Sequence, residues 1–340
     1  MRTVSALLAV VWLLWGAVPA NGQALGEVFR KVNASVVVVR ARGRDVTGGG
    51  QVRFSETGSG VLVSADGLVM TAAHVVQTMD EVNVEFLGGE TVEARVVASE
   101  PAADLSLLKL DHVPPGSLVA RMANSDTVKI GDQVIVIGAP YGLAHAMTVG
   151  WISARWAPNT VYRSMPLAEF FQTDAVINTG NSGGPLFSMG GEVIGIVSHN
   201  ISKSGGSEGL GFVVTMNTAR RLLLEQKSFW TGLEGRLLDD QLADLLNLPP
   251  NETGFLVKNV ATGSPAESLG IRGSTKVVVI DGDSVALGGD IILRVQGIPL
   301  RGLADYEQIR EVMAKTPPGG TLTVTVLRAG KVIDLTGTKP

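Results

Sequence analysis

Three segments of the chain each place one polar, reactive side chain at the end of an apolar stretch. His74 lies in TAAHVV, Asp104 in AADLSLL and Ser182 in GNSGGPL. A serine hydroxyl becomes an effective nucleophile when a neighbouring imidazole accepts its proton. A buried carboxylate on the far imidazole nitrogen holds the correct tautomer and stabilises the imidazolium that forms. If folding brings the three groups together, these residue types predict acyl transfer.

The glycines around Ser182 suit the same chemistry. The attacked carbonyl becomes an oxyanion, which needs preorganised N–H donors. Glycines let the backbone bend so that the N–H groups of Gly180 and Ser182 converge, and Gly183 leaves room for a substrate. The segment therefore predicts an oxyanion hole at Gly180 and Ser182.

Other titratable residues compete weakly with these candidates. Asp174 also lies near Ser182, but its place before the nucleophile turn favours a loop-ordering carboxylate. His112, His145 and His199 have no partners at metal-ligand spacing, so we expect no metal site and no cofactor. His199 follows a predicted strand near the substrate, where a contact role remains open.

Composition excludes several classes of function. The 340 residues are 45% apolar and 18% charged, with a net charge of −4, which is too apolar for a disordered chain. The mild acidity offers no basic footprint for nucleic acid. The length corresponds to about two domains.

The N-terminus predicts export. Arg2 precedes an apolar run, residues 6–15, and then Pro19 and small residues, which is typical of a signal peptide spanning residues 1–22. An uncleaved membrane anchor is the alternative, although the run is shorter than the ~18–20 residues that cross a bilayer. The chain has no cysteine, so the exported fold is held without disulfides.

Strand patterns dominate up to residue 216. Short β-branched segments between Gly, Asp and Asn turns predict an all-β sandwich or barrel; the clearest are residues 36–39, 60–63, 82–86, 91–97, 105–110, 134–137 and 193–197. A helix capped by Asn217 is expected to follow. After a linker around residues 228–235, a smaller α+β module has strands near residues 254–260, 276–281, 290–296, 321–327 and 332–335, and a helix over 303–315.

The ordered motifs resemble the HtrA (Deg) family of chymotrypsin-like serine proteases. Beyond the triad segments, the likeness rests on further motifs in family order: GSGV at residue 58, NSD at 124, GAPYGL at 138, FQTDA at 171 and GLGF at 209. The resemblance implies a double β-barrel protease domain over residues 23–230, with His74 as general base, Asp104 as its orienting carboxylate and Ser182 as nucleophile.

The resemblance also implies where a substrate side chain would sit. The residue six positions before the nucleophile forms the base of the primary pocket in this fold, which places Val176 there with Ile177 beside it. Ser198 would lie at this pocket and steady Asp104. With no carboxylate at the base, small or medium aliphatic side chains are expected. Thr179 departs from the proline that the family usually has before the turn.

The module over residues 231–340 resembles a PDZ domain. The resemblance implies a carboxylate-binding loop at Thr253, Gly254, Phe255 and Leu256, followed by a strand to which a C-terminal peptide adds. The helix around Tyr306–Met313 would form the other wall of the groove. An extra stretch, residues 272–288, departs from the family pattern.

Together these features predict a periplasmic, homotrimeric serine endopeptidase that cleaves unfolded polypeptides and binds C-terminal peptides through its PDZ domain. Residues 24–32 are expected at the trimer contact. Two alternatives remain open: a membrane-tethered protease with one client, and a chaperone-like holdase whose proteolysis is vestigial.

Overall fold

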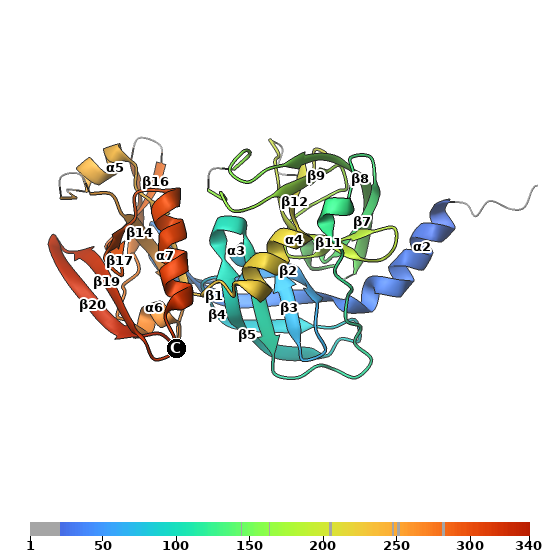
Figure 1. The fold of residues 1–340 in the computed structure, drawn as a ribbon, viewed down its shortest axis with the longest axis horizontal. Helices are drawn as coiled ribbons and strands as arrows, with labels where there is room; N and C mark the ends of the chain where they lie inside the picture. Colours follow the sequence, from blue (N-terminus) through green and yellow to red (C-terminus); the bar gives the residue numbers. More distant parts are fainter. Residues whose placement is uncertain are drawn as a thin grey trace, which may run out of the picture.

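The protein folds into two β-barrels packed side by side, with an α+β domain next to them (Figure 1). The computed structural model describes residues 21–340 except 144, 163, 204–205, 247, 250–251 and 281–282. The predicted signal segment therefore lies almost entirely outside the described residues. Helix α2 (Asn21–Val32) leads into the first barrel from the side opposite the C-terminal domain. No helix in the described ranges is long and apolar enough to cross a membrane.

The first barrel is closed, and its core is built from alternating aliphatic side chains. Its strands, in order around the barrel, are β1 (Val36–Thr47), β2 (Gly50–Leu62), β3 (Leu68–Thr71), β6 (Leu105–Leu110), β5 (Thr91–Glu100) and β4 (Met79–Glu85). Val37, Val39 and Val84 are fully buried inside it. Val36, on the other face of β1, packs into a second cluster that includes Phe187 of the second barrel, because successive side chains of a strand point to opposite faces.

The second barrel closes in the same way. Its strands are, in order around the barrel, β10 (Pro185–Ser188), β11 (Val193–Asn200), β12 (Gly211–Thr215), β9 (Phe170–Thr173), β8 (Ala146–Trp156) and β7 (Gln133–Gly138). The prediction of an all-β double barrel is therefore confirmed.

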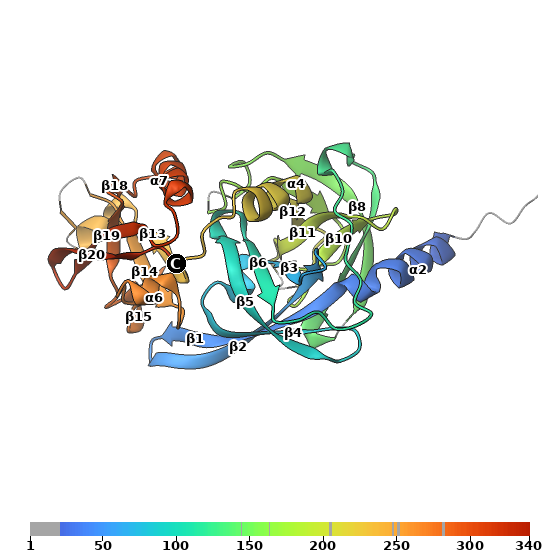
Figure 2. The same cartoon turned by 60° about the horizontal axis from the view of Figure 1, so that its bottom comes forward.

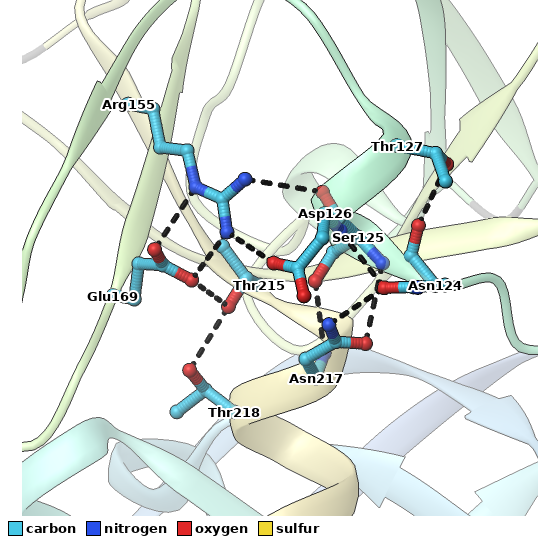
Figure 3. A network of polar contacts seen from close by, with 9 residues as sticks. All are labelled: Asn124, Ser125, Asp126, Thr127, Arg155, Glu169, Thr215, Asn217 and Thr218. Atoms are coloured by element: carbon cyan, nitrogen blue, oxygen red, sulfur yellow. Dashed lines mark hydrogen bonds and ion pairs between the residues drawn. The ribbon is translucent and has the colours of Figure 1, made fainter.

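The helix after β12 differs from its prediction at the N-terminus. Helix α4 (Met216–Ala219) continues as a π-helix, η5 (Arg220–Glu225), and its N-cap residue is Thr215. Asn217 does not cap it: the Asn217 amide oxygen accepts the N–H of Ser125 at 3.2 Å, and its NH₂ group donates to Asn124 (Figure 3). The predicted cap residue therefore bonds to the turn η3 (Ser125–Thr127) and its N-cap residue Asn124 instead of to the first turn of its own helix.

The same network braces the second barrel around one guanidinium. Arg155 on β8 forms a paired contact with Glu169 at 2.9 and 3.0 Å and reaches Asp126 at 2.7 Å. Glu169 also accepts the hydroxyl of Thr215 (Figure 3). Planar paired contacts of this kind fix geometry as well as add energy, so strand β8 is tied to the start of α4.

The C-terminal domain contains an antiparallel sheet together with short helices and the longer helix at residues 303–315. The order is β13 (Leu233–Leu237), β14 (Phe255–Val260), β17 (Ile291–Val295), β19 (Thr321–Arg328) and β20 (Lys331–Thr338), while β18 (Ile298–Pro299) pairs with β17. The helix predicted over 303–315 is α7 (Leu303–Lys315). The extra stretch is a hairpin of β15 (Lys276–Ile280) and β16 (Asp283–Leu287). Two short helices, α5 (Asp240–Leu245) and α6 (Pro265–Ser268), were not predicted.

Contacts from several elements join the C-terminal domain to the barrels. The long β1–β2 hairpin reaches it (Figure 2), and there Asp45 pairs with Lys258 at 2.7 Å. On the other side α7 faces the first barrel (Figure 1), and its Tyr306 and Arg310 both reach the buried carboxylate of Glu100. The domain interface thus contacts the end of β5, four residues before Asp104.

Candidate active site

His74 is held by a single helical turn at the end of β3. Helix α3 (Ala73–Val76) buries Ala73, Val75 and Val76 in the first barrel, so His74 is the residue of this turn that faces out. Its side chain is 46% exposed. The apolar residues of TAAHVV therefore anchor the turn and leave the imidazole at the surface between the barrels.

Asp104 lies buried beside this imidazole. It ends the 3₁₀ turn η2 (Pro101–Ala103) in a left-handed conformation, with φ 53°. Its carboxylate accepts the Nδ1 proton of His74, with Nδ1 2.9 and 3.0 Å from the two oxygens, and also the backbone N–H of His74 at 3.1 Å. The hydroxyl of Ser198 donates to Oδ2 at 2.5 Å. The prediction that Ser198 steadies Asp104 is confirmed.

Ser182 and His74 line one cavity of about 240 Å³. The Ser182 hydroxyl donates to the carbonyl oxygen of Ser198 at 3.1 Å. Folding therefore brings together all three residues singled out by the sequence, although the triad segments are far apart in the chain. To donate to His74 Nε2, the hydroxyl must leave this carbonyl.

Burial and charge shift the pKa values of His74 and Asp104 in opposite directions. Burial alone would lower the pKa of His74, but the charge and hydrogen bond of Asp104, with a smaller effect of Glu56, raise it above its ordinary 6.5. Burial alone would raise the pKa of Asp104, yet His74 and the hydrogen bonds of Ser198 and the backbone lower it. Asp104 is thus an anion that favours the imidazolium form of His74.

The loop before Ser182 is held in one conformation by contacts on both sides. The carbonyl of Thr179 accepts the N–H of Tyr141 at 2.9 Å, so the N–H of Gly180, on the other side of the same planar peptide, points the opposite way. Gly180 has φ +100°, and a Cβ there would lie 2.1 Å from the carbonyl oxygen of Ala139. Ser59 on β2 donates to the Gly180 carbonyl at 2.7 Å, which fixes the loop against the first barrel.

The pocket residues are placed only partly as predicted. Ile177 and Ser198 line the cavity next to Ser182. Val176 does not line it: the side chain is 44% exposed, and its carbonyl accepts the Thr148 hydroxyl at 2.9 Å. The consecutive residues from Ile177 to Gly180 line the cavity, so the structure places Ile177, and not the predicted Val176, at this position.

The predicted peptide loop of the C-terminal domain is also misplaced. Phe255 and Leu256 belong to β14, which pairs with β13 on one side and β17 on the other. Gly254 lies against Ile291 of β17, and the Thr253 hydroxyl donates to Leu300. A strand bonded on both sides has no free backbone groups for an added strand. On this side of the sheet, the edge strand is β13.

Several residues at the site were missed or undervalued. Glu56 of β2 and His199 of β11 both line the cavity. The signal for Glu56 was its place two residues before the GSG motif, which leads into the His74 segment. Asp174 accepts the backbone N–H of Trp151 at 2.6 Å, as expected of a loop-ordering carboxylate.

Two six-stranded barrels with a His-Asp-Ser site between them define a chymotrypsin-like serine protease fold. Residues 58–196 match the trypsin-like peptidase domain family. A probable periplasmic serine endoprotease DegP-like of Pseudomonas fulva is 34% identical over 280 residues, covering 79% of this chain and 56% of that protein. The periplasmic serine endoprotease DegP of Escherichia coli K12 is 31% identical over 295 residues, covering 85% and 58%.

A solved structure extends the likeness over nearly the whole chain. The HtrA-type protease AlgW with a tripeptide is 30% identical, covers 95% of this chain and 98% of its own, and superimposes with a TM-score of 0.52. The chain therefore belongs to the family of HtrA-type proteases. It spans a little over half the length of the DegP-type relatives it matches.

Proposed function

We propose that the protein is an exported serine endopeptidase of HtrA type that cleaves unfolded polypeptides through an acyl-enzyme. The observation that carries the proposal is the Asp104–His74 pair beside Ser182 in one cavity. The periplasmic names of the DegP relatives support export to the periplasm, as does the signal-like N-terminus.

The first half of the reaction forms the acyl-enzyme. As Ser182 Oγ bonds to the substrate carbonyl carbon, its proton passes to His74 Nε2, and Asp104 stabilises the imidazolium. The N–H groups of Gly180 and Ser182 receive the oxyanion, and losing one such donor costs about 3 kcal/mol of transition-state stabilisation. His74 then gives its proton to the leaving nitrogen, and the peptide C–N bond breaks.

The second half returns the enzyme to its starting state. A water molecule gives a proton to His74 and its oxygen to the acyl carbon. The imidazolium returns the proton to Ser182 Oγ as the new carboxylic acid leaves.

We further propose that the C-terminal domain is a PDZ domain that binds C-terminal peptides at the edge of β13. The supporting observations are the position of β13 as the terminal strand of the sheet and the peptides present in the AlgW structures. We also propose a homotrimer with residues 24–32 at the contact, and light scattering of the purified chain tests it.

Degradation of casein tests the activity. Wild type is expected to cleave casein, while Ser182→Ala, which retains every backbone donor of the loop, is expected to be inactive. Equal failure of both proteins, together with suppression of casein aggregation, would instead support the holdase alternative.

A further inference from the structure

We propose that His199 is a positioning residue of the triad: it holds the Ser198 hydroxyl as a donor to Asp104 and so sets the charge that His74 experiences. This inference rests on the proposed protease function. It assigns a second imidazole to the site, linked to Asp104 through the Ser198 hydroxyl.

The contacts form a continuous chain across the site. His199 Nδ1 lies 2.8 Å from Ser198 Oγ, and Ser198 Oγ donates to Asp104 Oδ2. Asp104 in turn accepts from His74 Nδ1. The carboxylate thus lies between two imidazoles, one in direct contact and one acting through a hydroxyl.

The proton positions in this chain follow from simple exclusion. An ionised carboxylate can only accept, so the single hydroxyl proton of Ser198 must point to Asp104. Ser198 Oγ then has only lone pairs for His199, so His199 Nδ1 carries the proton and donates. The other tautomer would place a proton on His199 Nε2, which is buried and has no partner among the described residues.

An aromatic enclosure keeps His199 neutral. Its ring stacks on Phe212, with centroids 5.4 Å apart and planes at 12°, and meets Tyr162 and Phe170 edge-on at 4.1 and 5.7 Å. Burial lowers the pKa of His199 to about 4, with the charge of Asp104 acting against that shift. Near neutral pH the residue is therefore a fixed dipole rather than a charge.

The consequence for His74 has a definite sign. A hydroxyl that accepts one hydrogen bond donates a stronger one, by roughly 10–30%. Without the His199 donor, the hydrogen bond from Ser198 to Asp104 would be weaker and would offset less of the negative charge of Asp104. The carboxylate would then stabilise the imidazolium form of His74 more strongly, and the pKa of His74 would rise. The other charged group acting on His74 is Glu56 on β2, which these changes leave in place.

Two variants separate the proposed role from simple packing. His199→Phe keeps the stacked ring and removes the donor, whereas His199→Asn keeps an N–H near the Nδ1 position and removes the ring. The measurement is kcat/KM against pH on a fluorogenic peptide, with thermal unfolding of each protein. The His74 imidazole is also titrated by NMR, because that readout needs no activity.

We expect His199→Phe to raise the acid midpoint by about 0.3–0.6 pH unit, a two- to fourfold change in the protonation equilibrium. His199→Asn should retain the wild-type midpoint despite a lower Tm. Ser198→Ala should raise the midpoint, and adding His199→Phe to it should produce no further rise, since the two residues act in series.

The opposite pattern would overturn the inference. An unchanged midpoint in His199→Phe, or equal shifts in the Phe and Asn variants, means that His199 only fills space. If wild type fails to cleave any peptide, the protease proposal fails, and the NMR titration of His74 still decides the role of His199.

Discussion

Arg310 of α7 offers the clearest test of how the C-terminal domain is held to the barrels. Its Nε lies 2.5 Å from Oε2 of Glu100, whose side chain is only 2% exposed. Glu100 also accepts the hydroxyls of Tyr306 and Ser228. In Arg310→Met the buried carboxylate would lose its countercharge and keep only two neutral donors.

The expected cost can be worked out from this burial. Removing one partner of a buried ion pair destabilises by about 3–5 kcal/mol. We take about 3 kcal/mol, because the Tyr306 and Ser228 hydroxyls remain and the Arg310 side chain is 21% exposed. Since each 1.4 kcal/mol is tenfold, the equilibrium between docked and undocked domains should shift by roughly 100-fold.

Hydrogen exchange measured by mass spectrometry reports this shift. The N–H of Thr262 donates to the Asp80 carboxylate across the interface at 3.0 Å, and peptides containing Thr262 should exchange about 100-fold faster in Arg310→Met. Amides inside both barrels should not change. The matched control is Lys315→Met on the same helix, which breaks an exposed pair with Glu311 and should leave exchange unaltered. If Arg310→Met behaves like Lys315→Met, Glu100 does not hold the domains together.

Three further predictions concern the site and the peptide groove. Catalysis needs the neutral imidazole of His74, whose pKa is raised, so kcat/KM should be retained at high pH and lost as the pH falls through a midpoint above 6.5. Glu56→Gln should lower that midpoint in the pH profile of kcat/KM, and an unchanged midpoint would count against the charge effect of Glu56. Gly183→Ala should abolish casein cleavage, because the new Cβ would lie 2.3 Å from a backbone oxygen of β2 at φ +82°; substantial residual activity would contradict the close approach. Gln77 donates to the outward carbonyl of Leu233 on β13, so Gln77→Ala should tighten binding of a fluorescent C-terminal peptide about two- to tenfold in polarisation assays, whereas unchanged affinity would argue against β13 as the peptide site.

Local patterns in the sequence determined most of the fold. Short β-branched segments between turn residues predicted strands of both barrels, and the amphipathic spacing of residues 303–315 predicted α7 with its bounds. The triad could also be predicted, because His74, Asp104 and Ser182 lie in motifs whose flanking residues carry independent signals. Short helices such as α5 were missed, since one or two turns leave little periodicity to detect.

The predictions that the structure does not match concern features that depend on which distant segments pack against a residue. The strand signal of residues 255–260 was correct, but only long-range pairing shows that β14 has neighbours on both sides and that β13 is the edge. Val176 and Ile177 are both aliphatic, and only the path of the loop decides that Ile177 faces the cavity. Asn217 is a good cap residue, yet its side chain binds η3 instead.

The sequence by itself determined which chemical groups are present and which backbone conformations they favour, because both are properties of neighbouring residues. Only the tertiary structure decided the partners of those groups, such as His199 linked to Asp104 through Ser198, and Glu100 paired with Arg310. The physical reason is that burial, hydrogen-bond geometry and charge depend on atoms brought together from distant parts of the chain, and no local pattern encodes those distances.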